Sequence, residues 1–351
     1  MANEGSLPSA RPRKVLENVA AVTWEHPADR AALQALRAVP GFNEAVKKIV
    51  GYFGERGIRL IFQANAVQVG PRQFPRLHTL WTEVCTTMDW AERPPLFVSE
   101  TPIVNASAVG VDHPFVVVNS GTLRLIDEDE TRVLLGHELG HVMSGHALYR
   151  TVTLLILWLG LQNLPFLAGL ALLPIKLALL EWYRKSELSS DRAGLLASQD
   201  PRASLQLFLR LAGGADAIQR APLLQDMNLD AYLEQAREYE ELGGPLDKVY
   251  KILNTLGTTH PFHTLRAAEL QRWIDEGSYE RVLEGEYTHR GTEERERPLT
   301  SEFGDAAKHY AREAKETVSQ VADAAKRAAS AFSDSLRRTR RGDSSGEADR
   351  E

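Results

Sequence analysis

Apolar residues recur at helical spacing in the first hundred residues. An apolar stripe with a period near 3.6 predicts a helix from about Ala31 to Phe53, with a break at Pro40-Gly41. A second helix is predicted from Phe74 to Met88, and residues 58–70 between them have a mixed, partly extended pattern. Because no residue set here indicates a chemistry, residues 14–94 are predicted to form an N-terminal helical subdomain that packs on the rest of the chain.

The pattern changes to that of strands between residues 95 and 119. β-Branched and aromatic residues separated by turn signals predict three short strands, at 95–98, 105–111 and 114–119. A short helix is predicted around residues 122–125. The acidic run 127–130 then begins a longer helix that extends to about His146, since negative charge suits a helix N-terminus. Together these elements predict an α+β fold, mainly helical with a small antiparallel sheet.

The stretch from Val152 to Pro174 has no charged side chain. It is long enough for one transmembrane helix of about 20 residues, but two crossings would need about 40. Pro165 and Gly169 also interrupt the run. Residues 151–181 are therefore predicted to form a short helical hairpin. The hairpin either packs on protein or dips into one leaflet of a membrane.

The last third of the chain is predicted to be helical up to about residue 285, with breaks at 213–214 and 243–245. Residues 291–301 have the composition of a linker. Residues 302–340 are an Ala-rich amphipathic segment with heptad-like spacing, suited to a lipid surface, to self-association or to a partly ordered tail. Residues 1–13 and 341–351 are predicted to be disordered.

Composition narrows the classes of function. The net charge of −6 over 351 residues argues against non-specific nucleic-acid binding. The single cysteine, Cys85, excludes an internal disulfide and a cysteine-based metal site. No apolar secretory signal is found at the N-terminus, so a cytoplasmic location is predicted. Peripheral or monotopic membrane attachment through 151–181 and 302–340 is the alternative. The sequence gives no oligomeric state.

An H-E-x-x-H motif lies near the end of the helix that begins at the acidic run. His137 and His141 are four residues apart, so both imidazoles leave the same helix face and can hold one Zn²⁺. Glu138 lies beside the open position of such a metal, where a carboxylate can take a proton from water. The motif supplies two ligands, and a catalytic zinc site needs a third.

A polar helix after the apolar stretch carries two acidic residues at the same spacing. Glu187 can be the third ligand, and Asp191 can accept the second N–H of a ligand histidine and so orient it. The alternative is a solvated acidic pair. If Glu187 and the motif meet on one metal, residues 151–181 cannot be a single membrane crossing, because the ligands would then lie on opposite faces of the bilayer.

The other histidines fit the site less well. A metzincin needs its third histidine at position 147, which is Ala147. His146 is one residue short of that position and is interpreted as a structural helix residue. His263 could compete with His260 for a role in the site, and His113 is interpreted as a loop histidine.

Three sequence blocks between about residues 95 and 270 resemble the HtpX / CAAX-prenyl-protease family of gluzincin metallopeptidases. The first runs from Asn105-Ala106-Ser107-Ala108-Val109-Gly110 through Gly121-Thr122-Leu123 and the acidic run to the H-E-x-x-H motif. The second is Glu187-Leu188-Ser189-Ser190-Asp191, similar to the E-x-x-A-D pattern of the family with Ser190 in place of alanine. The third is Thr259-His260-Pro261 followed by Arg266, similar to T-H-P…R.

The resemblance implies a zincin-type fold and a role for each matching residue. His137, His141 and Glu187 would bind one Zn²⁺, Glu138 would be the general base and Asp191 would orient a ligand. His260 would stabilise the oxyanion of the transition state. The strand of Asn105, Ala106, Ser107 and Ala108 would be an exposed edge facing the active-site cleft, on which an extended peptide adds as another strand. Arg266 would contribute to substrate binding.

The sequence thus predicts a zinc metalloendopeptidase domain over residues 95–290, with protein or peptide substrates and a role in protein quality control. The alternative is a zinc-stabilised, chaperone-like protein that binds extended chains without cleaving them. That alternative has no need for Glu138. A prenyl-protein protease proper would need several clear membrane spans, which the sequence lacks.

Overall fold

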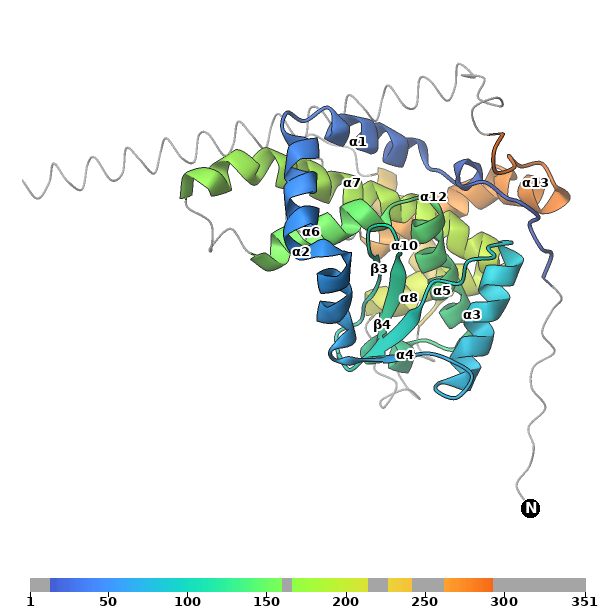
Figure 1. The fold of residues 1–351 in the computed structure, drawn as a ribbon. Helices are drawn as coiled ribbons and strands as arrows, with labels where there is room; N and C mark the ends of the chain where they lie inside the picture. Colours follow the sequence, from blue (N-terminus) through green and yellow to red (C-terminus); the bar gives the residue numbers. More distant parts are fainter. Residues whose placement is uncertain (1–12, 160–165, 214–226, 242–261, 293–351) are drawn as a thin grey trace, which may run out of the picture.

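The computed structural model describes residues 13–159, 166–213, 227–241 and 262–292. In these ranges helices surround one four-stranded sheet (Figure 1). The strands are β1 (Ala66–Gln68), β2 (Leu96–Ser99), β3 (Ala106–Val109) and β4 (Phe115–Asn119). The N-terminal helices are η1 (Ala21–Thr23), α1 (Pro27–Arg37), α2 (Phe42–Gln63) and α3 (Pro75–Thr87). The central helices are α4 (Ser120–Leu125), α5 (Glu128–Met143), α6 (Ala147–Leu159) and α7 (Phe166–Ser198). The last are α8 (Pro201–Gly213), α10 (Leu229–Glu241), α12 (His263–Asp275) and α13 (Ser278–Glu284).

The α+β prediction is confirmed, but the sheet is mixed and not wholly antiparallel. Its strand order is β1-β2-β4-β3, and β2 runs parallel to β4 while the other two pairs are antiparallel. The chain leaves β2, forms β3 at the far edge and returns as β4 between them. Local sequence patterns predict where strands lie but not which strands become neighbours. The parallel pairing of β2 with β4 therefore could not be predicted from the pattern of apolar and polar residues.

Most helix predictions hold, with shifts at their ends. Gly41 separates α1 from α2, and its φ of 78° explains why glycine is suited to this break. Pro27, Pro75 and Pro201 are each the first residue of a helix, where a missing N–H costs nothing. The predicted helix end at Phe53 coincides with a break in α2, since Gly54 has non-helical backbone angles (φ 65°, ψ 156°), and α2 continues beyond this break to Gln63. The linker at 291–301 begins at the limit of the described residues. The segment 302–340 and the tails 1–12 and 341–351 lie outside them.

Helix α5 begins with a reciprocal cap that explains the acidic run. Asp127 Oδ1 accepts a hydrogen bond from the Glu130 backbone N–H at 3.0 Å, and Glu130 Oε2 accepts one from the Asp127 N–H at 2.9 Å. The helix ends at Met143, three residues before the predicted end at His146.

Helices α5 and α7 pack so closely that their glycines cannot carry a side chain. A Cβ on Gly136 would lie 2.4 Å from the Ala197 Cβ, and one on Gly140 would lie 2.5 Å from the Ala193 Cβ. A Cβ on Gly194 would lie 2.8 Å from the Val133 carbonyl oxygen. This close approach brings the face of α5 that carries the H-E-x-x-H motif against the face of α7 that carries Glu187.

The substitution Gly136→Ala is expected to lower the free energy of unfolding by about 1–3 kcal/mol, because the added methyl group overpacks the α5–α7 contact. Urea unfolding measures the change. The matched control is Gly51→Ala in α2, where an added Cβ meets nothing within 4 Å. There alanine should raise stability by up to about 1 kcal/mol, since glycine is the poorer helix former. Equal effects at the two positions would contradict the close-packing argument.

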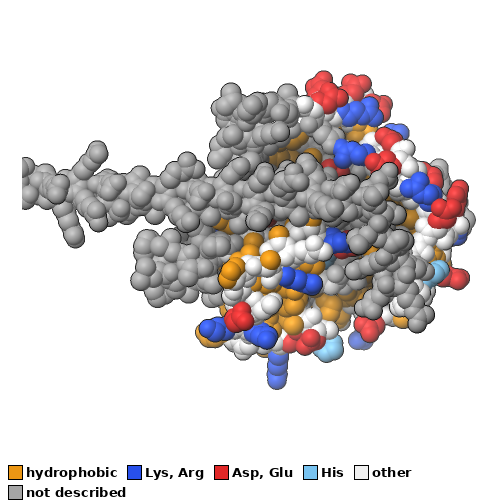
Figure 2. All heavy atoms as spheres, turned by 90° about the horizontal axis from the view of Figure 1, so that it is seen from above, with side chains coloured by type: hydrophobic (Ala, Val, Ile, Leu, Met, Phe, Trp, Pro, Cys, Tyr) orange, Lys and Arg blue, Asp and Glu red, His pale blue; other side chains and the backbone are white. Residues whose placement is uncertain are grey.

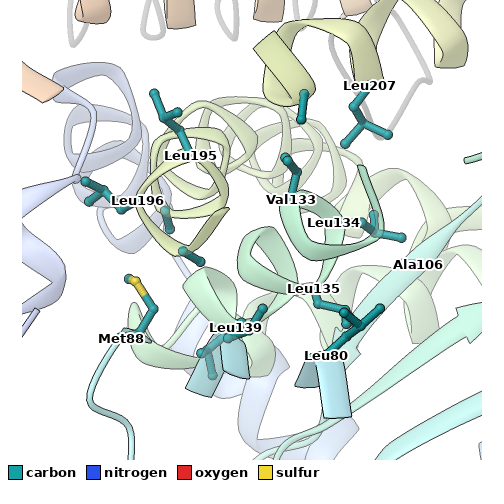
Figure 3. Packing of buried hydrophobic residues seen from close by; sticks show 14 of the residues in the cluster. Leu80, Met88, Ala106, Val133, Leu134, Leu135, Leu139, Leu195, Leu196 and Leu207 are labelled. Atoms are coloured by element: carbon teal, nitrogen blue, oxygen red, sulfur yellow. The ribbon is translucent and has the colours of Figure 1, made fainter. Parts of the chain in front are cut away.

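Helix α5 lies within the main hydrophobic core. Leu135 and Leu139 from α5 pack with Leu195 and Leu196 from α7 and with residues of α3 and β3 (Figure 3). Residues of the predicted N-terminal subdomain contribute to the same core, among them the fully buried Trp24. A second cluster joins α1, α2, α6 and α7. The N-terminal helices are therefore packed against the same long helix that carries Glu187.

The apolar stretch 151–181 forms α6 and the first half of α7. Residues 160–165 between these helices lie outside the described residues, and α7 continues without a break into the polar segment that contains Glu187. None of the helices in the described ranges combines the length and the apolar character that a membrane crossing requires. On the face shown in Figure 2, acidic and basic side chains of the described part are interspersed.

Candidate metal centre

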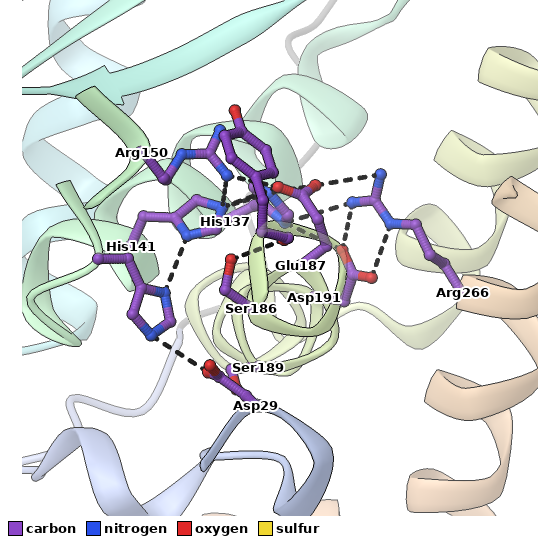
Figure 4. A network of polar contacts seen from close by, with 11 residues as sticks. Asp29, His137, His141, Arg150, Ser186, Glu187, Ser189, Asp191 and Arg266 are labelled. Carbon is purple, nitrogen blue, oxygen red and sulfur yellow. Dashed lines mark hydrogen bonds and ion pairs between the residues drawn. The ribbon is translucent and has the colours of Figure 1, made fainter. Parts of the chain in front are cut away.

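Two helices supply the predicted ligands. His137 and His141 lie on the face of α5 that meets α7, and Glu187 projects from α7 toward both (Figure 4). Their ligand atoms all lie within 4.8 Å of one another, and all three side chains are buried. The structure thus brings together residues that are separated by the whole apolar stretch in the sequence.

Each imidazole faces a different oxygen of the Glu187 carboxylate. The Nε2 atoms of His137 and His141 are 3.1 Å apart. The His137 Nε2 atom lies 3.4 Å from Glu187 Oε2, and the His141 Nε2 atom lies 3.3 Å from Glu187 Oε1. Two imidazoles and a carboxylate at this spacing form a candidate site for a divalent metal ion.

Asp191 orients the first of the two imidazoles. It lies one turn after Glu187 on α7, and its Oδ1 atom is 2.9 Å from His137 Nδ1, so the Nε2 atom of His137 faces the other ligands. Burial lowers the pKa of His137, but hydrogen bonds with Asp191 and Glu187 outweigh burial and raise the pKa to about 9. Metal binding must therefore displace a proton from this imidazole.

Arg266 of α12 holds Asp191 in turn. Its Nε and Nη2 atoms donate to Asp191 Oδ2 and Oδ1 at 2.8 and 2.5 Å, and its Nη1 atom lies 3.5 Å from Glu187 Oε2. The substrate contact predicted for Arg266 stays a prediction, while its ion pairs with these carboxylates are observed. The position of Arg266 in the sequence, six residues after His260, did not indicate its contacts with Asp191 and Glu187.

Glu138 lies beside the ligands without joining them. Its carboxylate accepts a hydrogen bond from the backbone N–H of Ala108 in β3, and burial raises its pKa. Its Oε2 atom is buried and has no hydrogen-bond partner among the described residues. An unpaired buried carboxylate oxygen is costly, so this atom indicates a place for water or substrate.

The predicted edge strand lies next to this centre, but the expectation that it is exposed is wrong, because all four residues of β3 are buried. β3 is the last strand of the sheet, and Asn105 and Ala106 line a cavity of about 210 Å³ together with His137, Glu138 and Glu187. Apolar side chains from α5 and α8 form another wall, namely Val133, Leu134, Leu207, Phe208 and Leu211. The side chains of Ser107 and Tyr183 are hydrogen-bonded, which links the strand to α7. His263 lines the cavity too, while His260 lies outside the described residues.

Arg150 is a site residue that the sequence pattern did not reveal. Its buried Nη1 atom donates to His141 Nε2 at 2.8 Å and contacts Glu187 Oε1, so it approaches two of the predicted ligand atoms. Its guanidinium lies 4.2 Å from the centroid of the Tyr183 ring. The one signal in the sequence was its position directly before the charge-free stretch, where a charge at the start of an apolar helix must find a buried partner.

His146 is a second such residue. The interpretation of His146 as part of the helix is wrong, because α5 ends at Met143 and α6 begins at Ala147. Its Nδ1 atom lies 3.0 Å from His141 Nδ1, and its Nε2 atom lies 3.1 Å from Asp29 Oδ2. Asp29 belongs to α1, for which the sequence indicated no chemistry.

Comparison with known proteins identifies the group to which this arrangement belongs. A family model described as Peptidase family M48 matches residues 71–274, which is more than half of the chain. The chain belongs to this family. The predicted resemblance is therefore confirmed, and the protein is a metallopeptidase with protein or peptide substrates.

Individual relatives of this M48 peptidase include a plant protein and bacterial proteins. The Plastoglobule-localized metallopeptidase 48, chloroplastic, of Arabidopsis thaliana is 32% identical over 277 residues, which are 78% of this chain and 78% of that protein. A Protease HtpX homolog of Pseudarthrobacter chlorophenolicus is 26% identical over 245 residues, 63% of this chain and 80% of its own length. A Protease HtpX homolog of Moorella thermoacetica is 32% identical over 95 residues, which are 26% of this chain and 31% of that protein. No solved structure matches the chain.

Proposed function

We propose that the protein is a zinc-dependent endopeptidase with its metal on His137, His141 and Glu187. The observation that carries this proposal is the spacing of the donor atoms. Tetrahedral zinc with bonds of about 2.0–2.1 Å places its ligands roughly 3.3 Å apart. Here the two Nε2 atoms are 3.1 Å apart, and each faces its own Glu187 oxygen, Oε1 at 3.3 Å from His141 and Oε2 at 3.4 Å from His137. One donor atom from each of the three residues lies within 4.8 Å of the others. Three protein ligands leave a fourth position for chemistry, as in other catalytic zinc sites.

Zinc bound there would supply Lewis acidity, which polarises a peptide carbonyl and lets water attack it at neutral pH. Glu138 accepts the proton of the attacking water, and its Oε2 atom has no other hydrogen-bond partner among the described residues. Burial raises the pKa of Glu138, which favours the protonated carboxyl group that then donates this proton to the leaving amine. The Ala108 N–H fixes the position of this carboxylate.

The proposed substrate is an extended peptide that pairs with β3. β3 is the last strand of the sheet, and Asn105 and Ala106 line the cavity that contains Glu138. The wall that includes Leu207 and Leu211 suits an apolar side chain next to the scissile bond. His260 is proposed to stabilise the oxyanion. A cytoplasmic location, with the hairpin 151–181 on protein or at a membrane surface, belongs to the same proposal.

Removal of metal tests this function. The purified full chain should cleave unfolded casein at internal peptide bonds, lose this activity after dialysis against a strong chelator and regain it with one equivalent of Zn²⁺. Mass spectrometry of the products shows whether cuts are internal and whether apolar residues flank them. If the chain binds Zn²⁺ and forms a stable complex with casein but does not cleave it, the chaperone-like alternative is supported and the proposal is contradicted.

A further inference from the structure

His141, the second histidine of the metal centre, is connected to the carboxylate of Asp29 through His146. His141 Nδ1 lies 3.0 Å from His146 Nδ1, and His146 Nε2 lies 3.1 Å from Asp29 Oδ2. The hydroxyl of Ser189 on α7 donates to the same Asp29 oxygen at 2.6 Å. All four side chains are buried (Figure 4). A line of hydrogen bonds therefore runs from a predicted ligand to helix α1.

Two local features of the sequence build this line. Helix α5 ends in a Schellman motif, in which Gly145 has a φ of 69°, its N–H bonds the Val142 carbonyl and the His146 N–H bonds the His141 carbonyl. This turn places the His146 ring back beside His141. On the other side, His26 caps α1 by accepting the Ala28 N–H on its Nδ1 atom at 3.1 Å, which sets Asp29 in the first turn.

The hydrogen bonds allow one consistent arrangement of protons. Arg150 donates to His141 Nε2 at 2.8 Å, so the proton of a neutral His141 lies on Nδ1. That N–H must then donate to His146 Nδ1, which leaves the proton of His146 on Nε2. This second N–H donates to the Asp29 carboxylate. Each bond then has one donor and one acceptor, and His141 Nε2 carries the lone pair that accepts from Arg150 here and that a bound metal would take instead.

We propose that Asp29 and His146 are positioning residues of the metal centre, which hold His141 in the tautomer and orientation that bind the metal. The inference rests on the zinc site proposed above. It gives each ligand histidine a carboxylate, with Asp191 acting directly on His137 and Asp29 acting on His141 through His146. Carboxylate partners of this kind raise the basicity of a ligand imidazole and fix its orientation.

The proposal extends the metal centre into the N-terminal part of the chain. Asp29 lies outside residues 71–274, which match the family model, so that match assigns it no role. Helix α1 packs with α6 and α7 in a shared apolar cluster. The packing of α1 therefore does more than bury apolar surface. It also places the Asp29 carboxylate where it can orient His141 through His146.

Zinc affinity of the full chain tests the proposal. Asp29→Asn removes the charge, and His146→Phe removes both hydrogen bonds while keeping an aromatic ring beside Trp182. Each should raise the Kd for Zn²⁺, measured by competition with a chelating indicator, by about 10–100-fold. The matched control is Glu269→Gln, which weakens the hydrogen bond between Glu269 and the His26 Nε2 atom at the start of the same helix but leaves the line of hydrogen bonds from His141 to Asp29 intact.

Thermal unfolding of the metal-free variants separates positioning from folding. Asp29→Asn and Glu269→Gln should both lower the unfolding temperature, and the former alone should weaken zinc binding. Equal zinc affinities of wild type and both positioning variants would overturn the inference while leaving the proposed function intact. A wild type that binds no zinc would overturn both.

Nitrogen NMR of the folded, zinc-loaded wild type gives a second measurement that needs no variant. The spectrum should show His146 protonated on Nε2 and bare on Nδ1. A His146 ring protonated on Nδ1 could not accept from His141 and would contradict the proposed line of hydrogen bonds.

Discussion

Replacing Glu138 with glutamine is expected to reduce peptidase activity by about 10²–10⁴-fold, the usual contribution of a general base. The amide has nearly the same shape but cannot accept a proton from water. Glu138 is not one of the three residues whose donor atoms converge, so the variant should bind zinc as the wild type does. Casein cleavage and a zinc titration on the same preparation measure the two properties.

The control for Glu138→Gln is another acid-to-amide change on the same helix. Asp129→Asn alters an exposed side chain of α5 whose ion pair is with Arg132, far along the helix from the motif. Its activity should equal that of the wild type. Unchanged casein cleavage in Glu138→Gln would show that another group takes the proton, and the proposed mechanism would then be wrong.

Glu187→Ala is expected to abolish zinc binding and to lower the free energy of unfolding of the metal-free protein by about 3 kcal/mol. Zinc binding is lost because two imidazoles alone hold the metal weakly. Stability falls because Glu187 contacts the buried guanidinium of Arg150, which would then have no carboxylate partner among the described residues. Zinc titration and urea unfolding in the presence of chelator give the two values.

A double variant separates these two effects. In Glu187→Ala/Arg150→Met the uncompensated cation is gone, and an apolar side chain takes its place against Tyr183. The double variant should therefore recover most of the lost stability while still binding no zinc. If its stability equals that of Glu187→Ala alone, the ion pair with Arg150 does not explain the loss.

The sequence predicted those parts of the molecule that local patterns encode. The spacing of His137 and His141 on one helix face, and of Glu187 and Asp191 on another, follows from 3.6 residues per turn. The helix with the H-E-x-x-H motif was predicted to begin at the acidic run 127–130, because negative charge suits a helix N-terminus. The structure adds the reason these helices meet, which is the contact of Gly136, Gly140 and Gly194 with their neighbours.

The rest depends on contacts between distant segments. Asp29 and His146 are separated by most of the first half of the chain, and nothing in the surroundings of either residue in the sequence indicates the other. Residues 14–94 were therefore not expected to contribute a residue to the metal centre. The position of Arg150 directly before the charge-free stretch is compatible with burial, but it does not indicate which residue pairs with it. The parallel pairing of β2 with β4 depends on the path of the chain, which strand patterns do not record.

The contact of Arg150 and Arg266 with Glu187 also sets the overall charge of the buried centre. Within hydrogen-bonding reach of the ligands, these two cations face the carboxylates of Glu138, Glu187 and Asp191. His137, whose pKa is raised to about 9, adds a third positive charge in the metal-free protein, so the cations and carboxylates balance there. When a divalent cation replaces the His137 proton, the cavity becomes net positive. The same side chains would then favour the negative charge that develops on a peptide carbonyl oxygen as its bond is broken.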